Sequence, residues 1–105
     1  IIPYTAAATT TGSRWTINGP GSPTLLNYRS WYPLTATTET NNAATAYDIP
    51  AASNATSLTA GNVAVIKGII KPSADGTVIA RFASEVASSA IVAKAGATVF
   101  YQQVL

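Results

Sequence analysis

A hydrolase made from this chain would have to rely on carboxylates, because the sequence contains no histidine and no cysteine. Histidine is the commonest general base and metal ligand, and cysteine is the other common nucleophile and soft ligand. A hydrolase built from the remaining residues would need two carboxylates facing each other across a cleft, as in glycosidases. The acidic residues of the chain are Glu39, Asp48, Asp75 and Glu85.

None of these carboxylates lies in a recognisable catalytic motif. Asp75 directly precedes Gly76, a pair typical of tight turns, and Glu39 lies in a polar run rich in Thr and Asn. Asp48 with Glu85 is the remaining pair that a glycosidase interpretation could use.

For Glu85 a structural ion pair explains the residue better than catalysis, with Arg81, Lys94 or a base on a neighbouring subunit as its partner. We therefore predict a protein that is not an enzyme. We expect no catalytic residue, no metal site and no cofactor.

An aromatic and arginine cluster is the candidate contact site for a ligand or partner, and it consists of Arg29, Trp31 and Tyr32, with Tyr28 beside them. Arginine and aromatic side chains together can stack on a sugar or anchor a protein contact. The alternative is that Trp31 and Tyr28 fill the core, as Trp15 is expected to do.

The surface is expected to be nearly neutral. Charged residues make up 10% of the 105 residues, the formal net charge is +2, and 48% of the residues are hydrophobic; charged residues are about a quarter of an average soluble protein. The basic residues are scattered, so the chain has no cluster able to neutralise a run of phosphates. We predict no nucleic-acid partner. The basic residues are Arg14, Arg29, Lys67, Lys71, Arg81 and Lys94.

No membrane association is expected either, because no apolar run approaches the ~20 residues of a membrane span and no signal-peptide pattern is present. The chain opens at Ile1 rather than Met, as a processed or excised piece would.

The first half predicts few strands. Residues 1–13 are expected to be an N-terminal arm or linker without a buried face, followed by one domain over residues 14–105. Strands are expected at residues 14–17, 24–31 and 47–49. Residues 35–46 are either a long surface loop or a weakly paired edge strand.

The last third predicts two successive hairpins. Residues 63–70 and 76–82 flank a turn at 71–75, and residues 90–94 and 98–104 flank a turn at 95–97. Asp75–Gly76 and Ala95–Gly96 supply residues that tolerate the positive φ of such turns.

The expected strands at residues 63–70 and 98–104 are apolar on both faces. Such a strand is either covered on both sides within the domain or lies at a subunit contact. The candidate subunit interface consists of Val65, Ile69, Phe100 and Tyr101.

The block from Ala74-Asp-Gly-Thr through Phe82-Ala-Ser-Glu-Val86 to Ala93-Lys-Ala-Gly96 resembles the C-terminal β-sandwich segment of virion surface proteins of tailed bacteriophages. Tail fibres, tail-tip appendages and head-decorating proteins carry such a segment. The resemblance covers about residues 63–104 and departs from the usual pattern at Gln102-Gln103.

The resemblance implies an all-β, small antiparallel β-sandwich of the jelly-roll kind, like tumour necrosis factor or C1q, that is commonly trimeric. It implies a non-enzymatic structural protein of the virion that decorates the capsid or forms part of a fibre. The N-terminal arm would bind other virion proteins, and the loops could contact a host glycan or protein. The partners expected are therefore copies of the chain itself and other proteins of the particle.

Two further functions share the all-β architecture. The first is a carbohydrate-binding module that uses Arg29, Trp31 and Tyr32. The second is the protruding domain of a small RNA virus coat protein, which would lack the C-terminal block.

Overall fold

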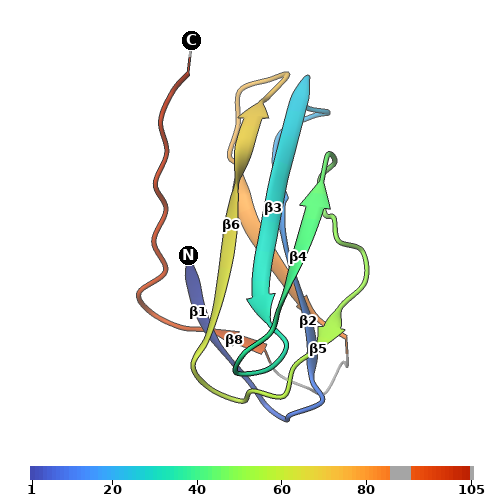
Figure 1. Ribbon diagram of the computed structural model, residues 1–105. Coiled ribbons are helices and arrows are strands. Elements are labelled where there is room, and N and C mark those ends of the chain that lie inside the picture. Colours follow the sequence, from blue (N-terminus) through green and yellow to red (C-terminus); the bar gives the residue numbers. More distant parts are fainter. Residues whose placement is uncertain (86–90, 105) are drawn as a thin grey trace.

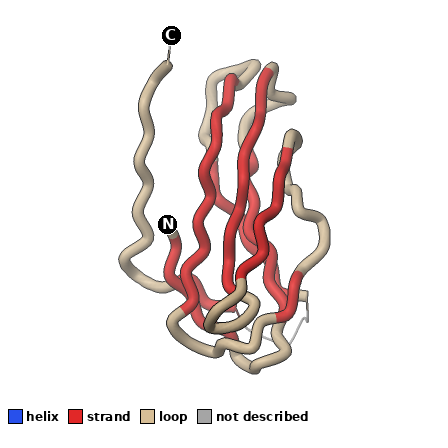
Figure 2. Tube along the Cα trace, viewed as in Figure 1, coloured by secondary structure: helices blue, strands red, loops and turns tan. Residues whose placement is uncertain are grey.

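The computed structural model describes residues 1–85 and 91–104, which form eight strands in two antiparallel sheets (Figure 1). The described residues contain no helix (Figure 2). The all-β prediction is confirmed, and the two sheets are compatible with a small β-sandwich. The strands are β1 (Ile2–Ala6), β2 (Gly12–Asn18), β3 (Leu25–Pro33), β4 (Glu39–Ala44), β5 (Asn54–Ala55), β6 (Asn62–Lys71), β7 (Ile79–Ser84) and β8 (Ile91–Ala93).

The larger sheet has the strand order β4-β3-β6-β1-β8 and is built on the pairing of β3 with β6. This register runs from Leu25 opposite Lys71 to Trp31 opposite Val65. Gly68 lies opposite Tyr28, and a Cβ atom at Gly68 would lie 2.3 Å from the carbonyl oxygen of Asn27. The two longest strands approach so closely at this point that only glycine fits.

The smaller sheet, of order β5-β2-β7, packs its inner face against the larger one through Trp15. The Trp15 ring is fully buried, lies 4.6 Å from the ring of Tyr4 on β1, and stacks at 4.7 Å on Phe82 of β7. Its indole N–H donates to the hydroxyl of Ser13 at 3.1 Å, so the polar atom of this buried aromatic is satisfied. The buried cluster around Trp15 consists of Tyr4, Ala6, Trp15, Tyr32, Ala64 and Ile91.

The prediction that residues 1–13 form an arm without a buried face is wrong. Within that range β1 lies between β6 and β8, with Ile2 opposite Ala64 and Tyr4 opposite Ala93. The Tyr4 side chain is 1% exposed. The Tyr4 ring contacts Trp15 and anchors this segment in the core. The run of small residues that follows Tyr4 has no pattern that would predict a buried strand.

The first predicted hairpin is wrong in its pairing although both of its strands exist. β6 pairs with β3 and β1, whereas β7 pairs with β2 in the other sheet. The turn signals at 71–76 therefore mark a crossing from one sheet to the other. Gly76, with a φ of 159°, lies in that crossing.

The second predicted hairpin does not form. β8 pairs with β1, and residues 98–104 run as an extended segment outside any ladder, along the side of the molecule (Figures 1 and 2). We call residues 98–104 the C-terminal segment. Ala90, expected to open the strand before the turn, lies outside the described residues.

Two smaller predictions about residues 35–49 had opposite outcomes. For residues 35–46 the edge-strand alternative is confirmed, since β4 lies at the edge of the larger sheet and pairs with β3. The predicted strand at 47–49 is wrong, because the chain turns there and Asp48 has a φ of +60°.

We expect Tyr4→Ala to destabilise the fold by about 3–5 kcal/mol, the cost of removing a fully buried aromatic ring. Urea denaturation followed by far-ultraviolet circular dichroism measures the change. Thr9→Ala, at an exposed position of the same N-terminal stretch, is the control and should change stability by less than about 0.5 kcal/mol. Equal, small effects of both substitutions would mean that β1 is an unanchored arm.

Candidate functional site

The strand β3 separates the predicted contact cluster onto two faces of the larger sheet. Tyr32 points into the core and is 1% exposed, and its hydroxyl accepts a hydrogen bond from the Asn54 side chain at 3.2 Å. Arg29 and Trp31 alternate with the buried residues of β3 and lie on the opposite face. Tyr32 is therefore a core residue, and the prediction that it contacts a ligand is wrong.

The register of the sheet places the predicted ligand contacts beside predicted interface residues. Trp31 lies between Asn41 on β4 and Val65 on β6. Arg29 lies between Ala43 and Lys67 in the same way. We call this the outer face, made of side chains from three strands: Asn27, Arg29, Trp31, Glu39, Asn41, Ala43, Val65, Lys67 and Ile69.

A depression of about 450 Å³ lies on the outer face, and Arg29 and Lys67 belong to its lining. These two cations are directly opposite each other in the ladder, where facing Cα atoms are about 5 Å apart. Arg29 donates to the side-chain oxygen of Asn41 at 3.3 Å. Neither cation has an ion pair in the described part of the chain, so the donors that Arg29 does not use for Asn41, and those of Lys67, are available to oxygen atoms of a ligand or partner.

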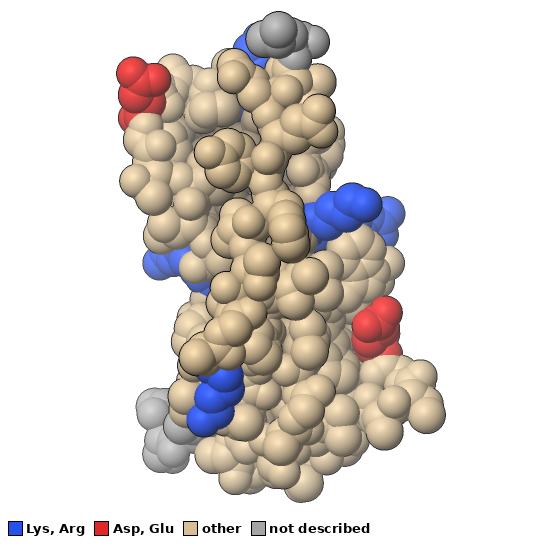
Figure 3. Space-filling model, turned by 90° about the vertical axis from the view of Figure 1, so that its left-hand side faces the viewer, with Lys and Arg blue, Asp and Glu red and all other residues tan. Residues whose placement is uncertain are grey.

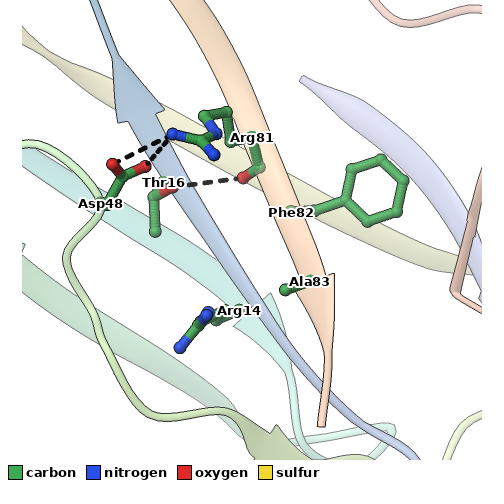
Figure 4. Close-up of a pocket in the computed structure, with 6 residues that line it drawn as sticks. All are labelled: Arg14, Thr16, Asp48, Arg81, Phe82 and Ala83. Carbon is green, nitrogen blue, oxygen red and sulfur yellow. Dashed lines mark hydrogen bonds and ion pairs between the residues drawn. The ribbon is translucent and has the colours of Figure 1, made fainter. Parts of the chain in front are cut away.

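A second depression, of about 280 Å³, lies on the outside of the smaller sheet (Figure 4). One guanidinium nitrogen of Arg81 lies 3.1 Å from both carboxylate oxygens of Asp48. The Asn18 side chain donates to the same carboxylate at 2.7 Å. This exposed ion pair fixes the turn at Asp48, and such pairs contribute little stability.

The carboxylates considered for catalysis do not face each other. Asp48 binds Arg81, and Glu85 accepts a hydrogen bond from the backbone N–H of Gly12 at 3.1 Å. Arg81 and Glu85 are four positions apart along one extended stretch, which spans about 13 Å. Within the described part of the chain Glu85 has the backbone of β2 as its partner rather than Arg81 or Lys94, and a base on a neighbouring subunit stays a prediction.

Among residues 1–85 and 91–104, no group of three His, Cys, Asp or Glu side chains is placed to hold a metal ion. The same residues include no helix long and apolar enough to cross a membrane.

The four predicted interface residues fall into two groups. Val65 and Ile69 lie on the outer face, and Ile69 is 46% exposed. Phe100 and Tyr101 lie on the C-terminal segment and are 83% and 94% exposed. Sequence reasoning missed Lys67 and Asn41, which the period-2 alternation of β6 and β4 would have placed on the same face once the register was known.

Comparison of the chain with protein-family models, with curated proteins and with solved structures gave no match.

Burial raises the pKa of the phenol groups of Tyr28 and Tyr32 above the ordinary value of 10.0. The neutral Tyr28 hydroxyl is held by the backbone, since it donates to the carbonyls of Ala46 and Ile49 and accepts from the Ile49 N–H. Ionisation would place a charge where β3 packs on the core. These phenols therefore favour the folded state below about pH 10, and this contribution is lost as the pH rises toward their folded-state pKa.

We expect the free energy of unfolding to fall as the pH is raised above about 10. Urea titrations across this range, with phenolate absorbance measured in parallel, test the expectation. A variant that combines Tyr28→Phe with Tyr32→Phe is the control and should lose stability less steeply with pH. The same slope for both proteins would contradict the assignment.

Proposed function

We propose that this chain is a non-enzymatic structural protein of a bacteriophage virion, displayed on the particle surface as a capsid decoration or as part of a fibre or appendage. Its work is to stabilise an assembly of like chains and to contribute a face to host attachment. The observation that carries the proposal is the exposure of large apolar side chains on the C-terminal segment.

That segment exposes four large side chains within six positions: Val99 is 83% exposed, Phe100 83%, Tyr101 94% and Val104 72%. Single exposed apolar residues are ordinary on a protein surface, but a contiguous group marks a contact site. Charged groups on this side of the molecule are few and scattered (Figure 3). A surface of this kind suits burial between chains.

The resemblance of residues 63–104 to virion surface proteins supports the same function. β6, β7 and β8 come from this block. The proteins it resembles act through shape and burial rather than turnover, commonly as trimers. We therefore propose a homotrimer on the virion, with other virion proteins as further partners.

A carbohydrate-binding module is the second candidate function, because the outer face presents Trp31 and Asn41 opposite each other in the ladder, with Arg29 bound to Asn41 and lining the depression on the same face. An aromatic ring beside hydrogen-bond donors is the usual composition of a sugar site. In this case Tyr32 takes no part.

The mass in solution tests the leading proposal. We expect light scattering coupled to size exclusion to give three times the chain mass of 10.8 kDa. The reason is that burial of the exposed apolar segment favours association. A 10.8 kDa particle at every concentration would contradict self-assembly in solution.

The second candidate predicts a different result. If the chain binds polysaccharide, Trp31→Ala should weaken binding at least about tenfold, the loss expected for one stacked aromatic contact of about 1.4 kcal/mol. A glycan array followed by calorimetry on the best ligand measures this. Thr37→Ala, in an exposed loop, is the matched control. No glycan binding by the unmodified protein would exclude the module.

A further inference from the structure

One edge of β6 lacks a partner over most of its length. β3 pairs with one edge of β6 along residues 65–71, whereas β1 covers the other edge only at residues 62–64. No strand in the described part of the chain pairs with that other edge at residues 65–71. We call residues 65–71 on this side the free edge of β6. Backbone N–H and C=O groups on a free edge are a template for an added strand.

The chain also holds an extended stretch without a strand partner, residues 99–104, which follows the contact of Thr98 with the start of β1. Ile1 and Thr98 exchange two hydrogen bonds, of 3.0 Å and 2.9 Å. The pairing of β1 with β6 reaches Ile2 opposite Ala64, and residues 99–104 continue without a ladder (Figure 1). A strand that continued the line of β1 would lie along the free edge, and no described strand takes that place.

The hydrophobic core is also incompletely covered. Phe82 is opposite Trp15 in the ladder and stacks on it, so its ring belongs to the inner face of the smaller sheet. Figure 4 shows the ring on the side of β7 away from the head group of Arg81. The ring is nevertheless 44% exposed. Ile66 and Ile70, on the inner face of β6, are only partly buried.

We propose that the C-terminal segment of a second copy of this chain adds to the free edge of β6 as an antiparallel strand. Phe100 would lie opposite Ile70 and Val104 opposite Ile66, both facing inward toward Phe82. Tyr101 would lie opposite Ile69 on the outer face. Such strand addition gains backbone hydrogen bonds for affinity and side-chain pairs for register.

Length and charge match between the two halves. In the proposed register residues 99–104 lie opposite residues 66–71, six residues on each strand, and the described segment carries no charged side chain. An uncharged segment can enter an apolar position without the cost of burying a charge.

A second copy fits the position better than the segment of the same chain. β1 is antiparallel to both β6 and β8, so the segment of the same chain, leaving β8, runs parallel to β6. It also starts on the far side of β1, where Thr98 binds Ile1. A segment from another copy can approach antiparallel, the pairing that is more stable per residue.

This inference rests on the self-association in the proposed function and names the contact that produces it. Each copy gives one strand and receives one, so a head-to-tail ring uses every segment and every edge once. Three copies, the number implied by the resemblance, form such a ring.

Disulfide trapping tests the contact, and the absence of cysteine from the chain makes the background clean. Ile69→Cys and Tyr101→Cys are made in separate chains, mixed and oxidised, and the linked peptides are identified by mass spectrometry. Directly opposite strand residues meet the Cα distance that a disulfide requires. We expect a cross-link between the two chains at several times the level obtained with Ile69→Cys and Gln102→Cys, because Gln102 faces the opposite side. Equal cross-linking by both pairs would overturn the proposal.

Truncation separates this proposal from the proposed function. A chain ending at Thr98 should keep its circular dichroism spectrum, since the described residues that it loses, 99–104, are all exposed, and should fall in mass from the oligomer to one chain. Phe100→Asp in the full-length chain should have the same effect. An oligomer that survives both changes would overturn strand exchange and leave virion assembly standing. A full-length chain that is monomeric would overturn both.

Discussion

The contact of Trp15 with Tyr4 and Phe82 joins the two sheets, and the rest of the structure depends on it. Trp15 lies on β2, the central strand of the smaller sheet. Its ring contacts the Tyr4 ring of the larger sheet and stacks on the Phe82 ring of β7. Because the larger sheet has five strands and the smaller three, the two layers cannot cover each other evenly. Phe82 remains 44% exposed, so the larger sheet does not fully cover the smaller sheet near this ring. A C-terminal segment added to the free edge of β6, as proposed above, would complete the cover.

The sequence predicted which residues form strands better than it predicted their partners. Residues 63–70 were expected as a strand and form most of β6, because a run of Val and Ile has strong β propensity. The hairpin expected between residues 63–70 and 76–82 does not form. Turn residues such as Asp75 and Gly76 determine where the chain changes direction, but they do not determine in which sheet the next strand pairs. β1 was missed because Pro3 and the small residues after Tyr4 weaken its alternating pattern.

The candidate site could be predicted by residue type but not by face. Arg29 and Trp31 belong to the predicted aromatic and arginine cluster, and both lie on the outer face. Tyr32 is adjacent to them in the sequence, yet neighbours along a strand point to opposite sides. Lys67 joins Arg29 only through the β3–β6 register, a long-range relationship that no local pattern contains. The same limit applies to the free edge, which is defined by the register of β1 against β6.

The position of β1 between β6 and β8 has a consequence for the order of folding. Tyr4 belongs to the first strand of the chain, but its neighbours in the sheet are Asn62 and Ala93. Closing loops of that length costs conformational entropy before the contacts that offset this cost have formed. Domains dominated by such pairings therefore fold in milliseconds to seconds rather than microseconds. During synthesis β1 cannot complete its pairing until residues up to Ala93 have left the ribosome. The Trp15 core is therefore completed late, and a nascent chain is exposed to proteases and to mispairing for longer than a protein built from local contacts.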